Sequence, residues 1–173
     1  MLFAADRSDV PLMRLLLELG ADPLLPNVNN TTPLMAAAGL GTREGHEEAG
    51  EENEALEAVE MLLDRGADVN GVDNTGDTAM HGAAANNYPR VVNLLANRGA
   101  DPRIWSKPNK SGRTPLYIAE GYVGVELRPD PPTIAAVTKL MLAAGLSLEG
   151  ARPAVVDQYR AIPAPPKATE PGK

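Results

Sequence analysis

Four apolar runs with helical spacing divide the chain, and each one ends at a glycine. These glycines are Gly20, Gly66, Gly99 and Gly145. Leucine, valine and methionine recur within each run at the three- and four-residue intervals that place side chains on one face of a helix. Glycine readily adopts the left-handed backbone conformation that ends a helix. The pattern therefore predicts four amphipathic helices, each stopped by its glycine.

Shorter, alanine-rich segments precede three of these runs, and each begins at a threonine. The segments start at Thr32-Pro33, Thr78-Ala79 and Thr114-Pro115. Threonine is a favourable helix cap, and proline at the first helical position loses no needed hydrogen-bond donor. The predicted unit is a short alanine-rich helix, a turn, a longer leucine-rich helix and an extended link. One such unit cannot cover its own apolar face, so neighbouring units must stack.

The unit that starts at Asp73 carries the most complete motif. It reads DNTGDTAMHGAA over residues 73–84, and 21 residues separate Thr78 from the Gly99 of a closing Gly-Ala-Asp, a tripeptide that occurs three times in the chain. In these motifs the chain resembles the ankyrin repeat family over about Met1 to Leu148. The resemblance implies an all-α solenoid of about four stacked helix-turn-helix repeats, joined by β-hairpin or turn links.

The same spacing predicts the domain organisation. The repeat domain spans 1–149, with units at about 1–27, 27–71, 72–105 and 107–149, and a proline-rich tail follows at 150–173. Units two and four are longer than the third by 13 and 10 residues, which places insertions at about 42–54 and 124–133. Part of the first insertion is expected to lengthen the following helix, whereas Leu127–Pro132 is expected to be non-helical inside.

The first unit begins inside its first helix, where Met1, Leu2 and Phe3 offer an apolar start. Terminal repeats normally have a polar outer face. We therefore expect the chain to be a fragment or truncated member of a longer protein. An irregular N-terminal cap is the alternative.

Charge restricts the classes of partner. The net charge is −7, and residues 42–60, with eight Glu and one Arg, carry all of it. An acidic chain is a poor nucleic-acid binder. No apolar stretch is long enough to span a membrane, and the start lacks the order of a signal peptide. Without cysteine the sequence does not indicate a compartment. The acidic stretch is either a solubilising loop or an arm for a basic partner or a cation.

The sequence gives little support for a catalytic function. The chain has two histidines and none of the common catalytic or phosphate-binding motifs. The resemblance implies that His81 is a structural group near a helix start. His46-Glu47-Glu48 is the best metal candidate, but its ligand spacing is irregular, and a solvated acidic loop is the alternative. We expect no enzyme activity, no cofactor and no metal.

The resemblance implies a concave recognition surface made of the link tips and the first helices. The tips are Asn27–Thr31, Val72–Asp77 and Trp105–Arg113, and the third is basic. The expected partner-binding residues are Trp105, Lys107, Lys110 and Arg113, followed by Asn74, Thr75, Asp77 and Tyr88. Trp105 is either an exposed anchor, since tryptophan is enriched among binding hot spots, or packs inward across the stacked links.

These patterns favour a non-catalytic protein-binding scaffold, with another protein of unknown identity as its partner. A structural segment that self-associates through an open N-terminal repeat is the alternative, and a metal-binding or enzymatic protein is a third class.

Overall fold

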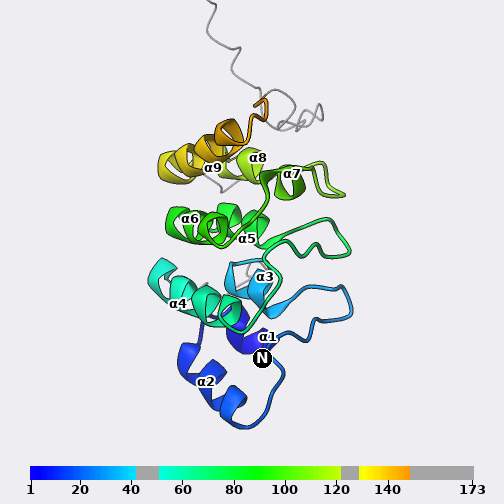
Figure 1. The fold of residues 1–173 in the computed structure, drawn as a ribbon, viewed down its shortest axis with the longest axis vertical. Coiled ribbons are helices and arrows are strands. Elements are labelled where there is room, and N and C mark those ends of the chain that lie inside the picture. Colours follow the sequence, from blue (N-terminus) through cyan, green and yellow to red (C-terminus); the bar gives the residue numbers. More distant parts are fainter. Residues whose placement is uncertain (42–50, 122–128, 149–173) are drawn as a thin grey trace, which may run out of the picture.

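The computed structural model describes residues 1–41, 51–121 and 129–148, and these form a stack of helix pairs without β-strands. The first helices of the four pairs are α1 (Leu2–Asp6), α3 (Pro33–Ala37), α5 (Ala79–Ala85) and α8 (Pro115–Ala119). The second helices are α2 (Val10–Glu18), α4 (Glu52–Leu63), α6 (Pro89–Asn97) and α9 (Pro131–Ala143). Each helix pair packs on the pair before it, from α1 and α2 to α8 and α9 (Figure 1). The predicted all-α solenoid is confirmed.

Three of the four first helices begin at the threonines that the sequence singled out. The Thr32 hydroxyl accepts a hydrogen bond from the Met35 amide, and the Thr114 hydroxyl accepts one from the Tyr117 amide, both at 3.2 Å. Proline follows both threonines at the first helical position. These caps satisfy backbone donors that a helix start leaves free.

The second helices end at the predicted glycines. Gly20, Gly66, Gly99 and Gly145 have φ between 70° and 95°, the left-handed region. The amide of the residue after each glycine reaches back five residues, as Ala21 does to the Leu16 carbonyl at 2.9 Å. This hydrogen bond satisfies a carbonyl of the last turn, and the chain then turns into the link.

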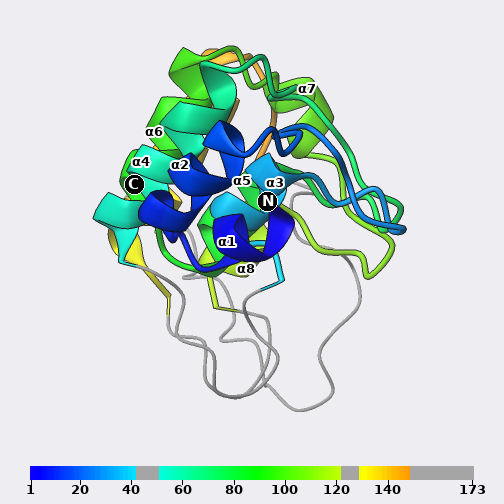
Figure 2. The same cartoon turned by 90° about the horizontal axis from the view of Figure 1, so that it is seen from below.

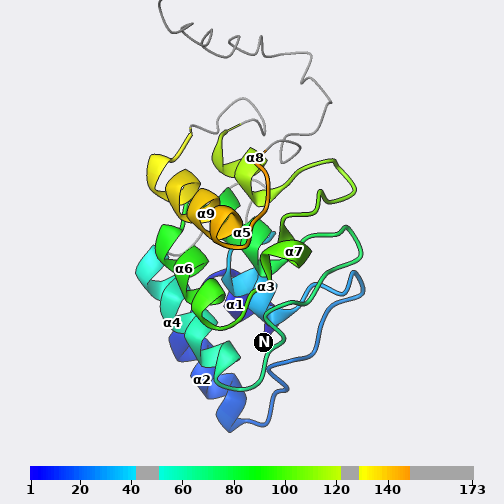
Figure 3. The same ribbon diagram turned by 45° about the horizontal axis from the view of Figure 1, so that its top comes forward.

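One continuous core runs along the stack. Small residues such as Ala5, Ala38 and Ala83 are fully buried in or beside the first helices, so the second helices can pack close to them. Leu62 lies inside the same core, and Leu94 and Leu140 pack against it. The first and second helices form two layers, with the link tips on the side away from the second helices (Figures 1 and 3). No helix of the described part is long and apolar enough to cross a membrane.

The two predicted insertions are described only in part. Helix α4 starts at Glu52 and has 12 residues against nine in α6, so the end of the first insertion does lengthen a second helix. Pro131 and Pro132 form the first turn of α9 rather than a non-helical stretch, because the first turn needs no amide donor at those positions. Residues 42–50, 122–128 and 149–173, including the whole predicted tail, lie outside the described residues.

Candidate partner-binding surface

Three link tips share one hydrogen-bonding pattern. Each tip contains a five-residue loop, at 27–31, 73–77 and 109–113, whose first residue donates its amide to the carbonyl four residues on: Asn27 to Thr31, Asp73 to Asp77 and Asn109 to Arg113, at 2.9–3.0 Å. The side-chain oxygen of the same first residue accepts two amides inside its own tip. Each tip is therefore a closed loop whose shape is fixed by its own polar groups.

The tips are also bonded to one another. The Asn74 amide donates to the Asn29 carbonyl at 2.9 Å, and the Lys110 amide donates to the Thr75 carbonyl at 2.8 Å. The Asn109 side-chain amide donates to the Asp77 carboxylate at 2.7 Å. Seen along the stack, the three tips lie on the same side of the molecule (Figure 2). The result is one continuous, hydrogen-bonded edge instead of three independent loops.

A cavity of about 530 Å³ lies between the first two tips and the first helices. Its apolar lining comes from Leu2 and Phe3 of α1 and from Leu40 after α3. Its polar lining includes Thr31, Asp73, Thr75 and Asp77. Phe3 is 63% exposed, and the Arg7 guanidinium lies 4.7 Å from the centre of its ring. The sequence signal for this cavity was the apolar start of the chain.

The third tip carries the predicted positive charge. Lys107, Lys110 and Arg113 are all exposed, and none of them forms an ion pair with another described residue. Arg103 differs, since its guanidinium lies 3.9 Å from the Asp101 carboxylate and 3.4 Å from the Ala144 carbonyl. The tip therefore presents three cations whose charges are available to a ligand.

Trp105 packs inward, and the expectation that it is an exposed anchor is wrong. It ends a short extra helix, α7 (Pro102–Trp105), and its exposure is 2%. Asp101 caps this helix by accepting the Arg103 amide at 2.8 Å. A partner of the folded repeats does not reach the indole ring. The inward-packing alternative is the correct one.

Tyr88 is also mostly hidden, with 8% exposure at the start of α6. Burial, together with the negative charges of Glu52 and Glu54, raises the pKa of its phenol.

Asn74 and Thr75 are exposed and Asp77 is half-buried, but their polar groups already form hydrogen bonds within and between the tips. The Asn74 side chain donates to the Val28 carbonyl at 3.4 Å, and the Thr75 hydroxyl bonds both Asp73 and Asp77.

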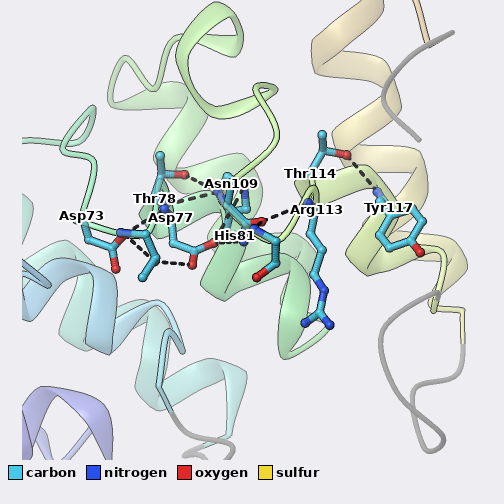
Figure 4. A network of polar contacts seen from close by, with 10 residues as sticks. Asp73, Asp77, Thr78, His81, Asn109, Arg113, Thr114 and Tyr117 are labelled. Atoms are coloured by element: carbon cyan, nitrogen blue, oxygen red, sulfur yellow. Dashed lines mark hydrogen bonds and ion pairs between the residues drawn. The ribbon is translucent and has the colours of Figure 1, made fainter. Parts of the chain in front are cut away.

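His81 is a buried structural group beneath the second and third tips. Its Nδ1 lies 3.2 Å from the Thr78 amide and 3.0 Å from the Thr78 hydroxyl, so the ring accepts the amide at the start of α5. Its Nε2 faces the Asp77 carboxylate at 4.0 Å (Figure 4). The side chain is 1% exposed and lies among the polar contacts that connect Asp73, Asp77 and Asn109.

We expect His81 to make stability depend on pH. Burial lowers the pKa of His81 below its usual 6.5, and the attraction of Asp77 only partly opposes this. The unfolded chain then binds a proton at a higher pH than the folded chain, so acidification favours unfolding. Wild type should lose free energy of unfolding more steeply than His81→Gln between about pH 7 and pH 5.5. Urea denaturation across this range checks it, and parallel curves for the two proteins would contradict it.

The metal candidate His46-Glu47-Glu48 lies outside the described residues. Within the described ranges, no group of three or more acidic or histidine side chains is placed to hold a metal ion.

Comparison with known proteins gives the same family along most of the chain. A family model described as ankyrin repeats in three copies matches residues 1–104 and 47–126. The chain is 33% identical over 149 residues to neurogenic locus notch homolog protein 1 of Xenopus tropicalis, an alignment that covers 77% of this chain and 6% of that protein. It is 33% identical over 132 residues to the neurogenic locus Notch protein of Drosophila melanogaster, covering 69% of this chain and 5% of that protein. A shorter match, 42% over 62 residues, is to the 2-5A-dependent ribonuclease of Mus musculus and covers 35% of this chain and 8% of that protein.

Proposed function

The chain belongs to the ankyrin repeat family, and we propose that it is a non-catalytic scaffold that binds another protein through its link tips and the concave face of its first helices. Ankyrin repeats generally mediate protein–protein interaction, and the family is generally non-enzymatic. The chain spans only 6% of the Xenopus Notch relative. The function proposed is therefore that of the repeat domain.

Preorganisation supports this proposal. The tips are closed by their own side chains and joined by main-chain hydrogen bonds such as Lys110 to Thr75. A loop that is already ordered loses little conformational entropy when a partner binds. Binding energy from tip contacts is then available for affinity.

The observation that carries the proposal is the trio of unpaired cations on the third tip. Lys107, Lys110 and Arg113 are exposed on a loop whose backbone is bonded to its neighbour. Complementary charge speeds association and disfavours partners of like charge. We expect the partner to place acidic side chains against this tip. Asn74, Thr75 and Asp77 would form the adjoining polar surface, whereas Trp105 and Tyr88 are buried.

Charge reversal on the tip tests the proposal. We expect Lys107→Glu/Lys110→Glu/Arg113→Glu to reduce capture of the partner from a cell lysate at least about tenfold, since attraction becomes repulsion. Quantitative mass spectrometry of proteins retained by the immobilised chain measures this.

A matched control variant shows whether the loss of binding depends on where the charges are reversed or only on the change in net charge. Arg65→Glu/Arg90→Glu/Lys139→Glu makes the same charge change at exposed positions on or next to the second helices. It should retain the partner that the tip variant loses. Equal retention by both variants, or equal loss, would contradict a tip-centred binding surface.

A further inference from the structure

Asn70 connects two consecutive links through its side-chain amide. It lies in the link that follows α4, four residues after Gly66. Its Nδ2 donates to the Gly99 carbonyl at 3.1 Å, and its Oδ1 accepts the Asp101 amide at 2.8 Å. Both partners lie where the link after α6 begins. We call these two hydrogen bonds the Asn70 clamp, because they hold the second link to the third.

The matching positions of the other links do not form the same clamp. Leu24 and Arg103 also stand four residues after the glycine that follows their helix. Leu24 has no polar side-chain group. The Arg103 guanidinium reaches the Ala144 carbonyl of the next unit at 3.4 Å, but a guanidinium has no acceptor to receive a bond in return. Of the three side chains, only Asn70 both donates to the next unit and accepts from it.

Asn70 is followed by Gly71, and this is the only Asn-Gly dipeptide in the chain. Asparagine before glycine deamidates readily, because glycine has no Cβ to keep its main-chain nitrogen away from the asparagine side chain. The Gly71 nitrogen attacks Asn70 Cγ, so that the N–Cγ bond forms and the Cγ–Nδ2 bond breaks. Nδ2 leaves as ammonia and takes the proton of the Gly71 amide. Water then opens the five-membered ring at either carbonyl, which yields aspartate or isoaspartate.

The folded link opposes this reaction through its hydrogen bonds. The Gly71 amide must lose its proton to attack, yet it donates that proton to the Asp68 carbonyl at 3.2 Å. The Asn70 main-chain amide donates to the Asp68 carboxylate at 2.9 Å, which fixes the backbone beside the side chain. The clamp holds both the nitrogen and the oxygen of the side-chain amide, so Cγ is kept from turning toward the Gly71 nitrogen. Deamidation therefore requires the link to open first.

The product of the reaction is unable to restore the clamp. A carboxylate has no proton to donate to the Gly99 carbonyl, and two acceptors facing each other without a donor are destabilising. The new negative charge also lies close to Asp68, whose carboxylate contacts the main-chain amide of the same residue. Isoaspartate in addition places one more carbon in the main chain and lengthens the link. After the reaction, the second and third links are held together more weakly than before it.

We propose that Asn70 is a spontaneous deamidation site that the folded stack protects, and that its reaction makes opening of the second link permanent. The co-reactant is water, and the products are ammonia and an aspartyl or isoaspartyl residue. The site lies outside the link tips, so the proposal goes beyond the binding function and does not depend on it.

Peptide mapping by mass spectrometry measures the reaction in the full chain at mildly alkaline pH. A synthetic peptide of residues 66–76 gives the rate without the fold. The folded chain should deamidate at residue 70 at least about tenfold more slowly than the peptide, because only its open fraction reacts. The chain unfolded in guanidinium should match the peptide in the same solution. Equal rates for the folded chain and the peptide, or a peptide that does not react, would overturn the proposal.

Variants at residue 70 test the clamp itself. Asn70→Asp reproduces one product, and Asn70→Ala removes the clamp without adding charge. Both should lower the guanidinium midpoint of unfolding by at least about 0.3 M, whereas the matched control Asn29→Asp should shift it by less than about 0.1 M. Asn29 is exposed, and its side chain has no hydrogen-bond partner among the described residues. An unchanged midpoint in Asn70→Ala, or equal shifts in the two aspartate variants, would show that the clamp does not hold the links.

Refolding after a long unfolded period tests whether the change is permanent. Wild type held in guanidinium until peptide mapping shows that residue 70 has reacted should refold with a lowered midpoint. Gly71→Ala is the control, because a Cβ on residue 71 hinders the attack and its nearest contacts in the fold would be at 3.3 Å. Held for the same time, this variant should refold with its starting midpoint. Full recovery of the reacted wild type, or an equal loss in Gly71→Ala, would contradict a permanent change caused by deamidation.

Discussion

Trp105→Ala is expected to lower the free energy of unfolding by about 3–5 kcal/mol, the usual cost of truncating a buried aromatic side chain. Trp105 is 2% exposed and belongs to the continuous core, where it anchors α7. Its loss would leave a cavity in this core. The expected effect is on folding stability. From the sequence alone, a binding role for an exposed Trp105 was an equal alternative.

Guanidinium denaturation followed by far-UV circular dichroism measures this, since the variant lacks the chain's only tryptophan. Trp105→Phe is the control. It keeps an aromatic ring and removes the indole Nε1, a buried donor without a hydrogen-bond partner among the described residues. We expect it to cost less than half as much as Trp105→Ala. A change below about 1 kcal/mol for the alanine variant would show that the ring is not buried in solution.

The stack could be predicted because its signals are local. Each second helix ends at a glycine that must adopt positive φ, and two of the threonine-led helices begin with a threonine hydroxyl cap and proline. These features depend on a few neighbouring residues, and backbone geometry restricts which residues serve. The repeat boundaries around the two insertions stay predictions, because most of both insertions lies outside the described residues.

The orientation of Trp105 could not be predicted in the same way. Five residues separate the start of the link from the tip in Asp22 to Asn27 and Asp68 to Asp73, but eight do so in Asp101 to Asn109. The longer link forms α7 and turns the indole inward. Asp101-Pro102 is a cap signal for this helix, yet Asp22-Pro23 has the same dipeptide, and Asp22 accepts the Leu24 amide without a following helix. Local chemistry does not decide between these outcomes, because the same Asp-Pro dipeptide precedes a helix in one link and not in the other.

The expected partner-binding residues show the same contrast between what the sequence does and does not predict. Lys107, Lys110 and Arg113 are exposed as predicted, since burying three unpaired cations would be costly. Tyr88 is buried, because it stands at the start of α6, a helix that packs into the stack. Charged side chains can therefore be assigned to the surface from the sequence. An amphipathic aromatic side chain cannot, because it is stable either buried or exposed.

Gly82→Ala is expected to lower the free energy of unfolding by about 1–3 kcal/mol, although alanine is the better helix former. The other repeats carry Ala36 and Ile118 at the same distance from their threonine, so sequence comparison alone favours this change. In α5, however, a Cβ on Gly82 would lie 2.6 Å from the Leu40 amide nitrogen and 3.0 Å from the Ala38 carbonyl oxygen. Both are backbone atoms, so relief requires α5 to move away from the end of α3.

Gly71→Ala is the matched control, the same substitution at a glycine that also lacks a positive φ. Its nearest contacts would be at 3.3 Å, and one of them is the mobile end of the Met35 side chain. We expect a change within about 0.5 kcal/mol. Trp105 fluorescence and circular dichroism together follow unfolding in both variants. If Gly82→Ala were instead more stable by about the 1 kcal/mol that helix propensity predicts, α3 and α5 could not approach as closely as described, and the close stacking of the first helices would need revision.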